Sequence, residues 1–168
     1  MAQYKSDRIR NVVLVGHSGA GKTSVAEAIL FDAGAISRLG KVTDGTTTSD
    51  YDPEEIKRKI SIYLSLLPFQ WKDTKVNLID TPGYLDFVAE VKAGLAVSDC
   101  AVVVICAVSG VEVGTEQVWA YANDLALPRL IFINKMDREN VNFYTRLKDI
   151  QTKLGSKCIP VQLPLGSE

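Results

Sequence analysis

Histidine and cysteine are scarce in this sequence, which has one histidine, His17, and three cysteines among its 168 residues. The cysteines, Cys100, Cys106 and Cys158, form no paired motif, so we expect no structural zinc site. Their odd number, and the apolar runs around two of them, are typical of small buried side chains rather than of a disulfide framework. A reducing, cytoplasmic setting fits this usage.

An excess of one charge is also missing, because 19 Lys and Arg residues oppose 20 Asp and Glu residues. The resulting net charge of −1 gives no basis for independent binding to nucleic acid or a membrane. The first residues lack the apolar segment of a signal peptide, and no later run approaches membrane-spanning length. With 46% hydrophobic residues, the chain is expected to form one well-packed, monomeric domain.

Strand-like and helix-like segments alternate along the chain, which predicts a three-layer α/β domain with a mostly parallel sheet. The second and third strands should form an antiparallel hairpin at one sheet edge, joined by a turn at Lys72 and Asp73. Six strands are expected, at residues 12–15, 60–66, 76–80, 100–107, 130–133 and 159–163.

Apolar residues at helical spacing predict four helices, at residues 24–31, 85–98, 116–125 and 144–154, the last of which ends at Gly155. Residues 34–59 are rich in Gly, Thr, Asp and Lys and have no apolar periodicity. A loop of that length in a compact domain is usually functional. We interpret it as a nucleotide-sensing segment, although its Thr-rich run could be only a polar linker.

Residues 16–23 read GHSGAGKT and fit the G-x-x-x-x-G-K-[ST] phosphate-binding pattern, between an apolar strand and a helix. In this P-loop, backbone N–H groups should surround a phosphate at the positive end of the helix. Lys22 should supply charge and the Thr23 hydroxyl should bind Mg²⁺. A plain glycine-rich turn is the alternative. The residues expected to contact the nucleotide are Gly16, His17, Ser18, Gly19, Ala20, Gly21, Lys22, Thr23 and Ser24.

The third predicted strand ends in Asp80-Thr81-Pro82-Gly83, at the carboxyl end where open α/β sheets hold their ligands. The Asp80 carboxylate can orient Mg²⁺ through water, and the Gly83 N–H can meet the γ-phosphate. A simple turn would explain the same letters without a ligand.

Asn134-Lys135-Met136-Asp137 follows the fifth predicted strand. One carboxylate can accept both parallel donors of guanine, N1–H and N2–H₂, which adenine does not present, so Asp137 should select guanine. Lys135 should lie along the base and Asn134 should tie this loop to the phosphate loop. Taken by itself, N-K-x-D could also be a polar strand exit.

Together, GHSGAGKT, LIDTPGYLDFVAEV and FINKMDREN resemble the GTPase domain of elongation factor G and its close paralogues over nearly the whole chain. Tetracycline-resistance ribosomal protection proteins and peptide-chain release factor three have similar sequences. The resemblance implies a P-loop NTPase fold, bound GTP or GDP with Mg²⁺, switch loops that order around the γ-phosphate, and the ribosome as partner of the full-length factor.

Two positions depart from the family pattern. The first switch of the family ends in a glycine and a Mg²⁺-binding threonine, where this sequence has Lys59 and, two positions later, Ser61. The resemblance makes Ser61 a metal ligand. Tyr84 stands where the family usually has the histidine that positions the attacking water. A phenol orients water but does not become a cation near neutral pH, so we expect slow hydrolysis, with Lys22, Gly83 and Tyr84 as the catalytic groups.

The family's last guanine-contact loop follows an inserted subdomain, and this sequence shows no counterpart. Gly166-Ser167 offers an apparent substitute, but residues 163–168 resemble the text that leads into the insertion. We therefore expect residues 1–168 to be a GTP-binding domain truncated before the inserted subdomain and the last guanine-contact loop, with weaker nucleotide affinity than the full protein.

The leading prediction is a GTP-binding and GTP-hydrolysing domain of an elongation factor G-like factor on the ribosome. A non-hydrolysing or very slow guanine-nucleotide switch module, or a ribosomal protection factor, is the alternative. A more distant possibility is an ATP-using phosphate-loop enzyme.

Overall fold

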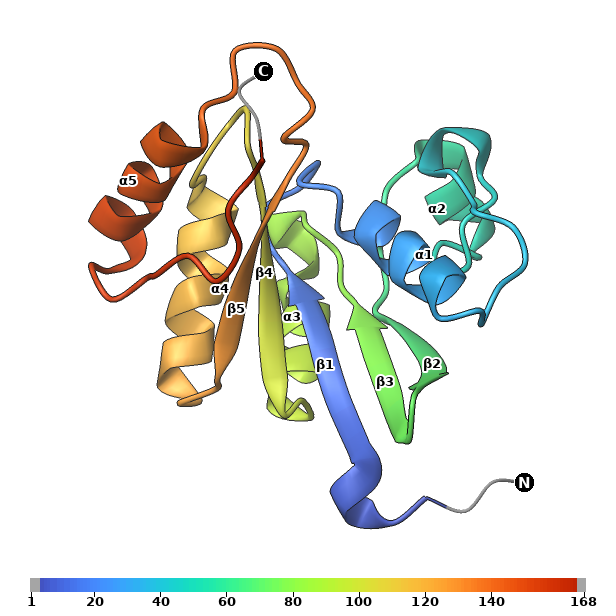
Figure 1. Ribbon diagram of the computed structural model, residues 1–168. Helices are drawn as coiled ribbons and strands as arrows, with labels where there is room; N and C mark the ends of the chain where they lie inside the picture. Colours follow the sequence, from blue (N-terminus) through green and yellow to red (C-terminus); the bar gives the residue numbers. More distant parts are fainter. Residues whose placement is uncertain (1–3, 166–168) are drawn as a thin grey trace.

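The computed structural model describes residues 4–165, which form a sheet with helices on both faces (Figure 1). The sheet has five strands in the order β2-β3-β1-β4-β5. All neighbours pair in parallel except β2 and β3, which are antiparallel at one edge. The predicted α/β class and mostly parallel sheet are therefore confirmed. The strands are β1 (Ile9–Val15), β2 (Ser65–Trp71), β3 (Thr74–Asp80), β4 (Cys100–Cys106) and β5 (Arg129–Asn134).

The helix α1 covers one face of the sheet, and α3, α4 and α5 cover the other. Successive side chains of each strand point to opposite faces, so each strand contributes to both layers. Val13 and Val15 of β1 pack with α3, α4 and α5, while Leu14 between them packs with α1. The helices are α1 (Lys22–Asp32), α2 (Pro53–Arg58), α3 (Val88–Ala96), α4 (Val113–Asp124) and α5 (Phe143–Leu154), with short 3₁₀ turns at Ser6–Arg8, Val42–Asp44 and Leu85–Phe87.

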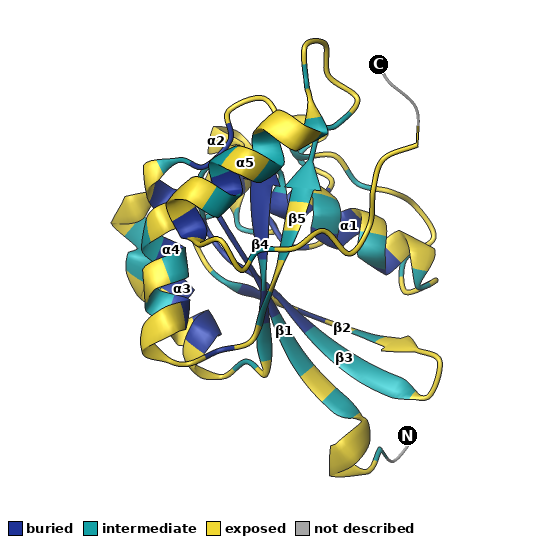
Figure 2. Ribbon diagram, turned by 60° about the vertical axis from the view of Figure 1, so that its left-hand side comes forward, coloured by how far each residue is buried: buried dark blue, intermediate teal, exposed yellow. Residues whose placement is uncertain are grey.

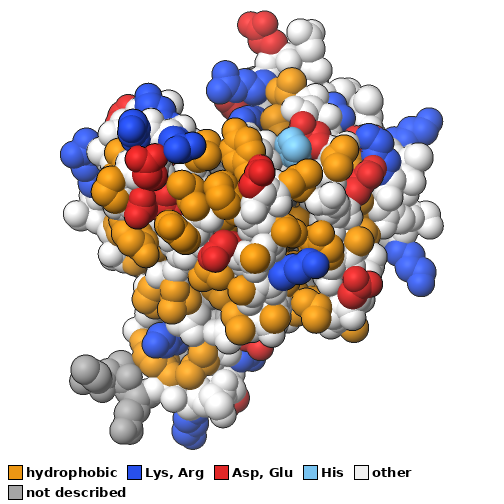
Figure 3. All heavy atoms as spheres, turned by 180° about the vertical axis from the view of Figure 1, so that it is seen from behind, with side chains coloured by type: hydrophobic (Ala, Val, Ile, Leu, Met, Phe, Trp, Pro, Cys, Tyr) orange, Lys and Arg blue, Asp and Glu red, His pale blue; other side chains and the backbone are white. Residues whose placement is uncertain are grey.

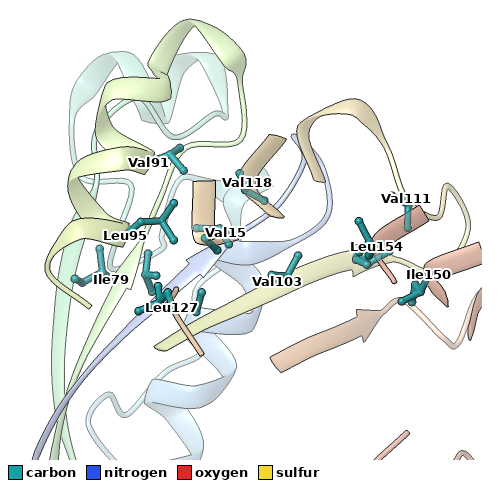
Figure 4. Close-up of a cluster of buried hydrophobic side chains, with 14 residues drawn as sticks. Val15, Ile79, Val91, Leu95, Val103, Val111, Val118, Leu127, Ile150 and Leu154 are labelled. Carbon is teal, nitrogen blue, oxygen red and sulfur yellow. The ribbon is translucent and has the colours of Figure 1, made fainter. Parts of the chain in front are cut away.

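Two apolar clusters form the core. The larger joins Val103 of β4 to Leu95 of α3, Val118 of α4 and Ile150 of α5 (Figure 4). The smaller includes Leu30 of α1 and residues of β1, β2 and β3. The strand β1 lies at the centre of the sheet, and its neighbour β4 is the most buried strand (Figure 2). Burial of each large aliphatic side chain stabilises the fold by about 1.5–3 kcal/mol. The two clusters therefore hold the helices against both faces of the sheet.

The predicted edge strand at residues 60–66 is shifted in the structure, where β2 begins at Ser65 and contains Pro68. The residues before it do not pair with a strand, because the N–H groups of Ile62 and Tyr63 donate to Glu55 and that of Leu64 donates to Glu90. Proline lacks an N–H group and is tolerated here because β2 is an edge strand. The hairpin itself is present, and Lys72 in its turn has a φ of 51°.

The predicted sixth strand at residues 159–163 is wrong. This segment has no regular structure, and Ile159 and Val161 are about three-quarters exposed, at 76% and 75%. Proline at positions 160 and 164 removes two N–H donors, and no described strand pairs with the segment. The alternating apolar pattern therefore lacks the neighbour that a strand needs.

The predicted loop at residues 34–59 contains a helix that the periodicity did not indicate. The helix α2 begins after Asp52, whose side chain and that of Glu55 form a reciprocal capping box, and Pro53 stands at its first position. The sequence Asp-Pro-Glu-Glu carries this signal locally. The helix has six residues, too few for an apolar period to be visible.

The surface agrees with the balanced composition. On the face seen from behind, basic side chains are dispersed among acidic and hydrophobic ones (Figure 3). Within residues 4–165, no helix combines the length and the apolar content that crossing a bilayer would require.

Candidate nucleotide-binding site

Three loops meet at one edge of the sheet because each follows a parallel strand at its carboxyl end. The phosphate loop connects β1 to α1, the Asp80 loop follows β3, and the Asn134 loop follows β5. The structure thus brings together motifs that are more than one hundred residues apart in the sequence.

The phosphate loop, residues 16–21, turns directly into α1. Gly21 precedes the first helical residue and has a φ of 97°, a left-handed conformation that favours glycine. A Cβ at this position would collide with the side-chain amide of Asn134. Ser24, in the first turn of α1, is exposed, while Ala20 is buried. No side chain among the described residues caps the N-terminus of α1, so its first N–H groups can bind an anion.

Lys22 lies inside this loop and is only 6% exposed. Its ammonium group donates hydrogen bonds of 3.1 Å to the carbonyl oxygens of Gly16 and His17. Burial lowers the pKa of Lys22 to about 8, against the opposing effect of the Asp80 and Asp50 carboxylates. The cation is thus held at the centre of the loop, close to where a phosphate would bind.

Hydroxyl and carboxylate oxygens gather beside Lys22. The Thr23 hydroxyl donates to Asp80 Oδ2 at 2.7 Å and lies 3.2 Å from the Ser61 hydroxyl. The Ser49 hydroxyl also donates to Asp80 Oδ2, at 3.0 Å. Ser61 donates in turn to Asp50 Oδ1, at 2.7 Å. The three predicted metal residues, Thr23, Ser61 and Asp80, therefore share one cluster of oxygen atoms.

The chemistry of this cluster suits Mg²⁺. Asp80 Oδ1 is buried and has no hydrogen-bond partner among the described residues, so one strong acceptor remains available. Magnesium prefers oxygen donors and usually shares its shell with phosphate and water. Within residues 4–165, no group of three or more His, Cys, Asp or Glu side chains could hold a metal by itself. The ion would therefore depend on Thr23, Ser61, Asp80 and the phosphates together.

The two carboxylates of the cluster are destabilised by burial. Burial raises the pKa of Asp80 to about 6, although hydrogen bonds from Thr23 and Ser49 and the charge of Lys22 favour its ionised form. Burial also raises the pKa of Asp50, partly offset by the hydrogen bond from Ser61. A cation bound here would stabilise the ionised form of both groups.

Gly83 approaches the phosphate loop closely enough that a side chain could not fit. A Cβ on Gly83 would lie 2.7 Å from Ser18 Cα and 2.5 Å from the Lys22 ammonium nitrogen. The backbone of Gly83 therefore lies directly beside the phosphate loop, next to Ser18 and Lys22. Tyr84 follows at the start of the Leu85–Phe87 turn and is 43% exposed. It lines a shallow depression with Gly16 and Gly83.

The third loop contacts the phosphate loop through two side chains. Asn134 Nδ2 donates to the Ala20 carbonyl at 2.9 Å, and Lys135 Nζ donates to the Gly19 carbonyl at 2.8 Å. Lys135 has a φ of 63°, a left-handed conformation, at the point where β5 has ended and the turn begins. Asp137 lies exposed in that turn. Its carboxylate is thus free of the core and open to a ligand at the edge of the site.

His17 connects the phosphate loop to the start of α4. Its Nδ1 accepts a hydrogen bond of 3.3 Å from the Gly114 N–H, and its Nε2 lies 3.6 Å from a Glu112 carboxylate oxygen. A nitrogen that accepts a hydrogen bond carries no proton, so Nδ1 is the unprotonated nitrogen in this contact. Through its two contacts, His17 links the phosphate loop to the N-terminus of α4.

Sequence reasoning missed Ser49 and Asp50 as members of the site. Both are buried, and each hydrogen-bonds a residue of the oxygen cluster. The only local signal was the polar run that ends at Ser49, inside the segment interpreted as nucleotide-sensing. The apparent substitute for the last guanine loop, Gly166-Ser167, lies outside the described residues.

Comparisons with known proteins agree with this geometry. The family described as the elongation factor Tu GTP binding domain matches residues 7–163. Elongation factor G 1 of Treponema denticola is 44% identical over 161 residues, which are 96% of this chain and 24% of that protein. A crystal structure from Thermus thermophilus superposes with a TM-score of 0.91 at 41% identity, over 95% of this chain and 24% of that one. The chain thus spans about a quarter of the length of these relatives. It belongs to the elongation factor Tu GTP-binding domain family and is an elongation factor G-like GTP-binding domain.

Proposed function

We propose that this chain binds GTP with Mg²⁺ and hydrolyses it, as part of a longer factor that acts on the ribosome in the cytoplasm. The observation that carries the proposal is the convergence of three motifs on one edge of the sheet. Thr23 bonds to Asp80, Gly83 packs against Ser18, and Asn134 bonds to Ala20. Family membership supports hydrolysis and disfavours a module that only binds nucleotide.

The phosphates would be held by the backbone of residues 16–24 and by Lys22. In that arrangement Lys22 exchanges its two carbonyl partners, Gly16 and His17, for phosphate oxygens. Magnesium would neutralise charge on the β- and γ-phosphates when bound. Thr23 and Ser61 offer hydroxyl oxygens for it and Asp80 a carboxylate, as their shared cluster supports.

The guanine base would be selected by Asp137. Its exposed carboxylate would accept hydrogen bonds from N1–H and N2–H₂ of the base. The stem of Lys135 would lie along the base, and Asn134 would keep this loop in register with the phosphate loop through Ala20. The contact geometry supports this division of roles.

Hydrolysis would use Gly83 and Tyr84 beside the γ-phosphate. The backbone N–H of Gly83 would donate to it, and the exposed Tyr84 phenol would orient the attacking water. Because a phenol stays neutral near pH 7, charge stabilisation of the transition state would be weaker than with a protonated imidazole. We therefore propose slow turnover until a partner such as the ribosome orders the site.

The domain would be completed by chain beyond residue 168, in the form of the family's inserted subdomain and last guanine-contact loop. Support comes from the open side of β5, where Leu130 and Phe132 are 49% and 42% exposed. These two side chains and the tail at residues 155–164 line a groove of about 1130 Å³. The matched relatives are about four times longer than this chain.

Tyr84→His in the full-length protein tests the catalytic part of this proposal. Single-turnover GTP hydrolysis with ribosomes should become faster, because an imidazolium adds charge stabilisation. Tyr84→Phe is the matched control, and it should be slower than the wild type because it loses the hydroxyl. Equal rates in all three proteins would remove Tyr84 from catalysis.

A further inference from the structure

The turn that carries Ser61 is wrapped around one buried carboxylate, that of Glu55 in α2. Glu55 is 1% exposed. Its Oε1 accepts hydrogen bonds from the backbone N–H groups of Ile62, at 2.9 Å, and Tyr63, at 3.1 Å. Its Oε2 accepts a hydrogen bond of 3.2 Å from the Asp52 N–H. Both oxygens are therefore bound by backbone donors, and no cation is needed to explain the burial of this charge.

The backbone of Glu55 holds the other side of the same turn. Its carbonyl oxygen accepts hydrogen bonds from the Lys59 N–H at the end of α2 and, at 3.2 Å, from the Ile60 N–H. Lys59 itself has a φ of 56°, a left-handed conformation that is costly for a residue with a Cβ. Hydrogen bonds to Glu55 therefore hold the two residues before Ser61, one of which is the strained Lys59, and the two residues after it.

The position of Ser61 decides whether the oxygen cluster is complete. Its hydroxyl lies 3.2 Å from that of Thr23 and donates to Asp50. If the turn opened, the Ser61 hydroxyl would leave, and Thr23 would remain with Asp80 alone. Among the described residues, Glu55 forms no hydrogen bond with Thr23 or Asp80. Its hydrogen bonds near that cluster go to the backbone around Ser61, and its negative charge also contributes to the raised pKa of Asp50, which is caused mainly by burial.

We propose that Glu55 is a positioning residue, which fixes the turn at residues 59–63 so that Ser61 reaches the magnesium bound with the nucleotide. This inference rests on the proposed GTP and Mg²⁺ binding and adds to it a residue outside the motifs. The neighbouring Glu54 provides a contrast, since among residues 4–165 its half-exposed side chain pairs with Lys57 and Arg58 on the surface and does not contact the turn.

Glu55→Gln tests this role with little change of shape. A glutamine has one acceptor oxygen, so its amide N–H₂ must face either the Asp52 N–H or the Ile62 and Tyr63 N–H groups. At least one backbone donor then loses its partner. Glu54→Gln is the matched control, because it removes a similar charge from the adjacent residue without touching the turn.

The measurement is the affinity of the full-length protein for a non-hydrolysable GTP analogue, with saturating Mg²⁺ and with EDTA. The ratio of the two affinities is the magnesium gain. Ser61→Ala and Glu55→Gln should each lower this gain roughly tenfold, the size expected for one lost charge-assisted contact. The double variant should lose no more than Ser61→Ala alone. Affinity in EDTA should be unchanged, because the phosphate loop is intact.

Amide hydrogen exchange provides a readout that needs neither nucleotide nor metal. At least one of the Asp52, Ile62 and Tyr63 N–H groups should exchange faster in Glu55→Gln than in the wild type, and all three should exchange at wild-type rates in Glu54→Gln. Wild-type exchange at all three positions in Glu55→Gln would overturn the proposed contact. If that variant does not fold, Glu55→Asp keeps the charge, shortens the reach and is subject to the same comparison.

The outcomes separate this inference from the function on which it rests. A wild-type protein that does not bind the GTP analogue removes the proposed function. A wild-type magnesium gain that is lost in Ser61→Ala but preserved in Glu55→Gln leaves the function standing and overturns the role of Glu55. Independent losses that add in the double variant also overturn it, because Glu55 would then act elsewhere.

Discussion

The Thr23 hydroxyl donates a hydrogen bond of 2.7 Å to Asp80 Oδ2, linking the first turn of α1 to the end of β3. Both residues are buried. Each belongs to a separate motif of the sequence, and each was assigned to Mg²⁺ on its own. Their direct contact makes them two sides of one site rather than two independent candidates.

Thr23→Ala should reduce the contribution of Mg²⁺ to GTP affinity, because it removes both a proposed metal ligand and the donor to Asp80. We expect a loss of roughly tenfold or more, measured with a fluorescent GTP analogue in Mg²⁺ and in EDTA. Thr152→Ala is the matched control, since Thr152 is exposed in α5 and lies outside the three loops of the site. Equal magnesium dependence in the two variants would contradict the assignment of Thr23.

Asp80→Asn should stabilise the metal-free protein at neutral pH. The pKa of Asp80 is raised from 3.8 to about 6 in the folded state, so the folded protein binds this proton more tightly than the unfolded chain does. The free energy of unfolding of the wild type therefore falls as pH rises from about 4 to about 6. Asparagine does not titrate, so the variant should gain up to about 3 kcal/mol by pH 7.

Urea unfolding in EDTA across this pH range checks the prediction. The advantage of Asp80→Asn should disappear below about pH 4, where Asp80 is protonated in both states. Asp137→Asn is the control, because it removes the same charge from an exposed position outside the buried cluster. A constant difference between Asp80→Asn and the wild type at every pH would contradict the argument.

Lys59→Gly should stabilise the fold by about 0.5–1 kcal/mol, because glycine adopts the left-handed conformation without strain. The sequence left open how a lysine would change this turn, and the structure retains the left-handed backbone, with φ 56° and ψ 40°. Chemical denaturation measures the effect. Lys57→Gly, inside α2, should instead destabilise by about 1 kcal/mol. Destabilisation by both substitutions would show that the turn is not strained.

Asp137→Asn should shift nucleotide preference from GTP toward xanthosine triphosphate. The amide can donate to the O2 of xanthine, whereas it meets the N2–H₂ of guanine with one donor against another. Competition binding in the full-length protein measures the ratio of the two affinities. Glu139→Gln, an exposed carboxylate in the same turn, should leave the ratio unchanged. A wild-type preference in Asp137→Asn would remove this residue from base recognition.

The parts of the fold that sequence predicted are those with local causes. Four apolar residues in a row, Val12 to Val15, indicated a buried strand, and Gly155 indicated the end of α5. The three nucleotide motifs were visible because each follows a strand. Their convergence was then a consequence of parallel pairing.

The parts that sequence missed depend on distant partners. The apolar alternation before Ser65 resembled a strand, but Glu55 and Glu90 bind the backbone groups that a neighbouring strand would otherwise use. Ile159 and Val161 alternate in the same way and find no neighbour to pair with among the described strands. Asp50 carries no periodic signal, and its place in the site appears only once Ser61 is brought beside it.

Nucleotide turnover by the full-length protein, with and without ribosomes, tests the central claim most directly. We predict that ribosomes increase GTP hydrolysis severalfold or more while ATP is neither bound nor hydrolysed. GTP hydrolysis that ribosomes do not change, or ATP binding equal to that of GTP, would contradict the account.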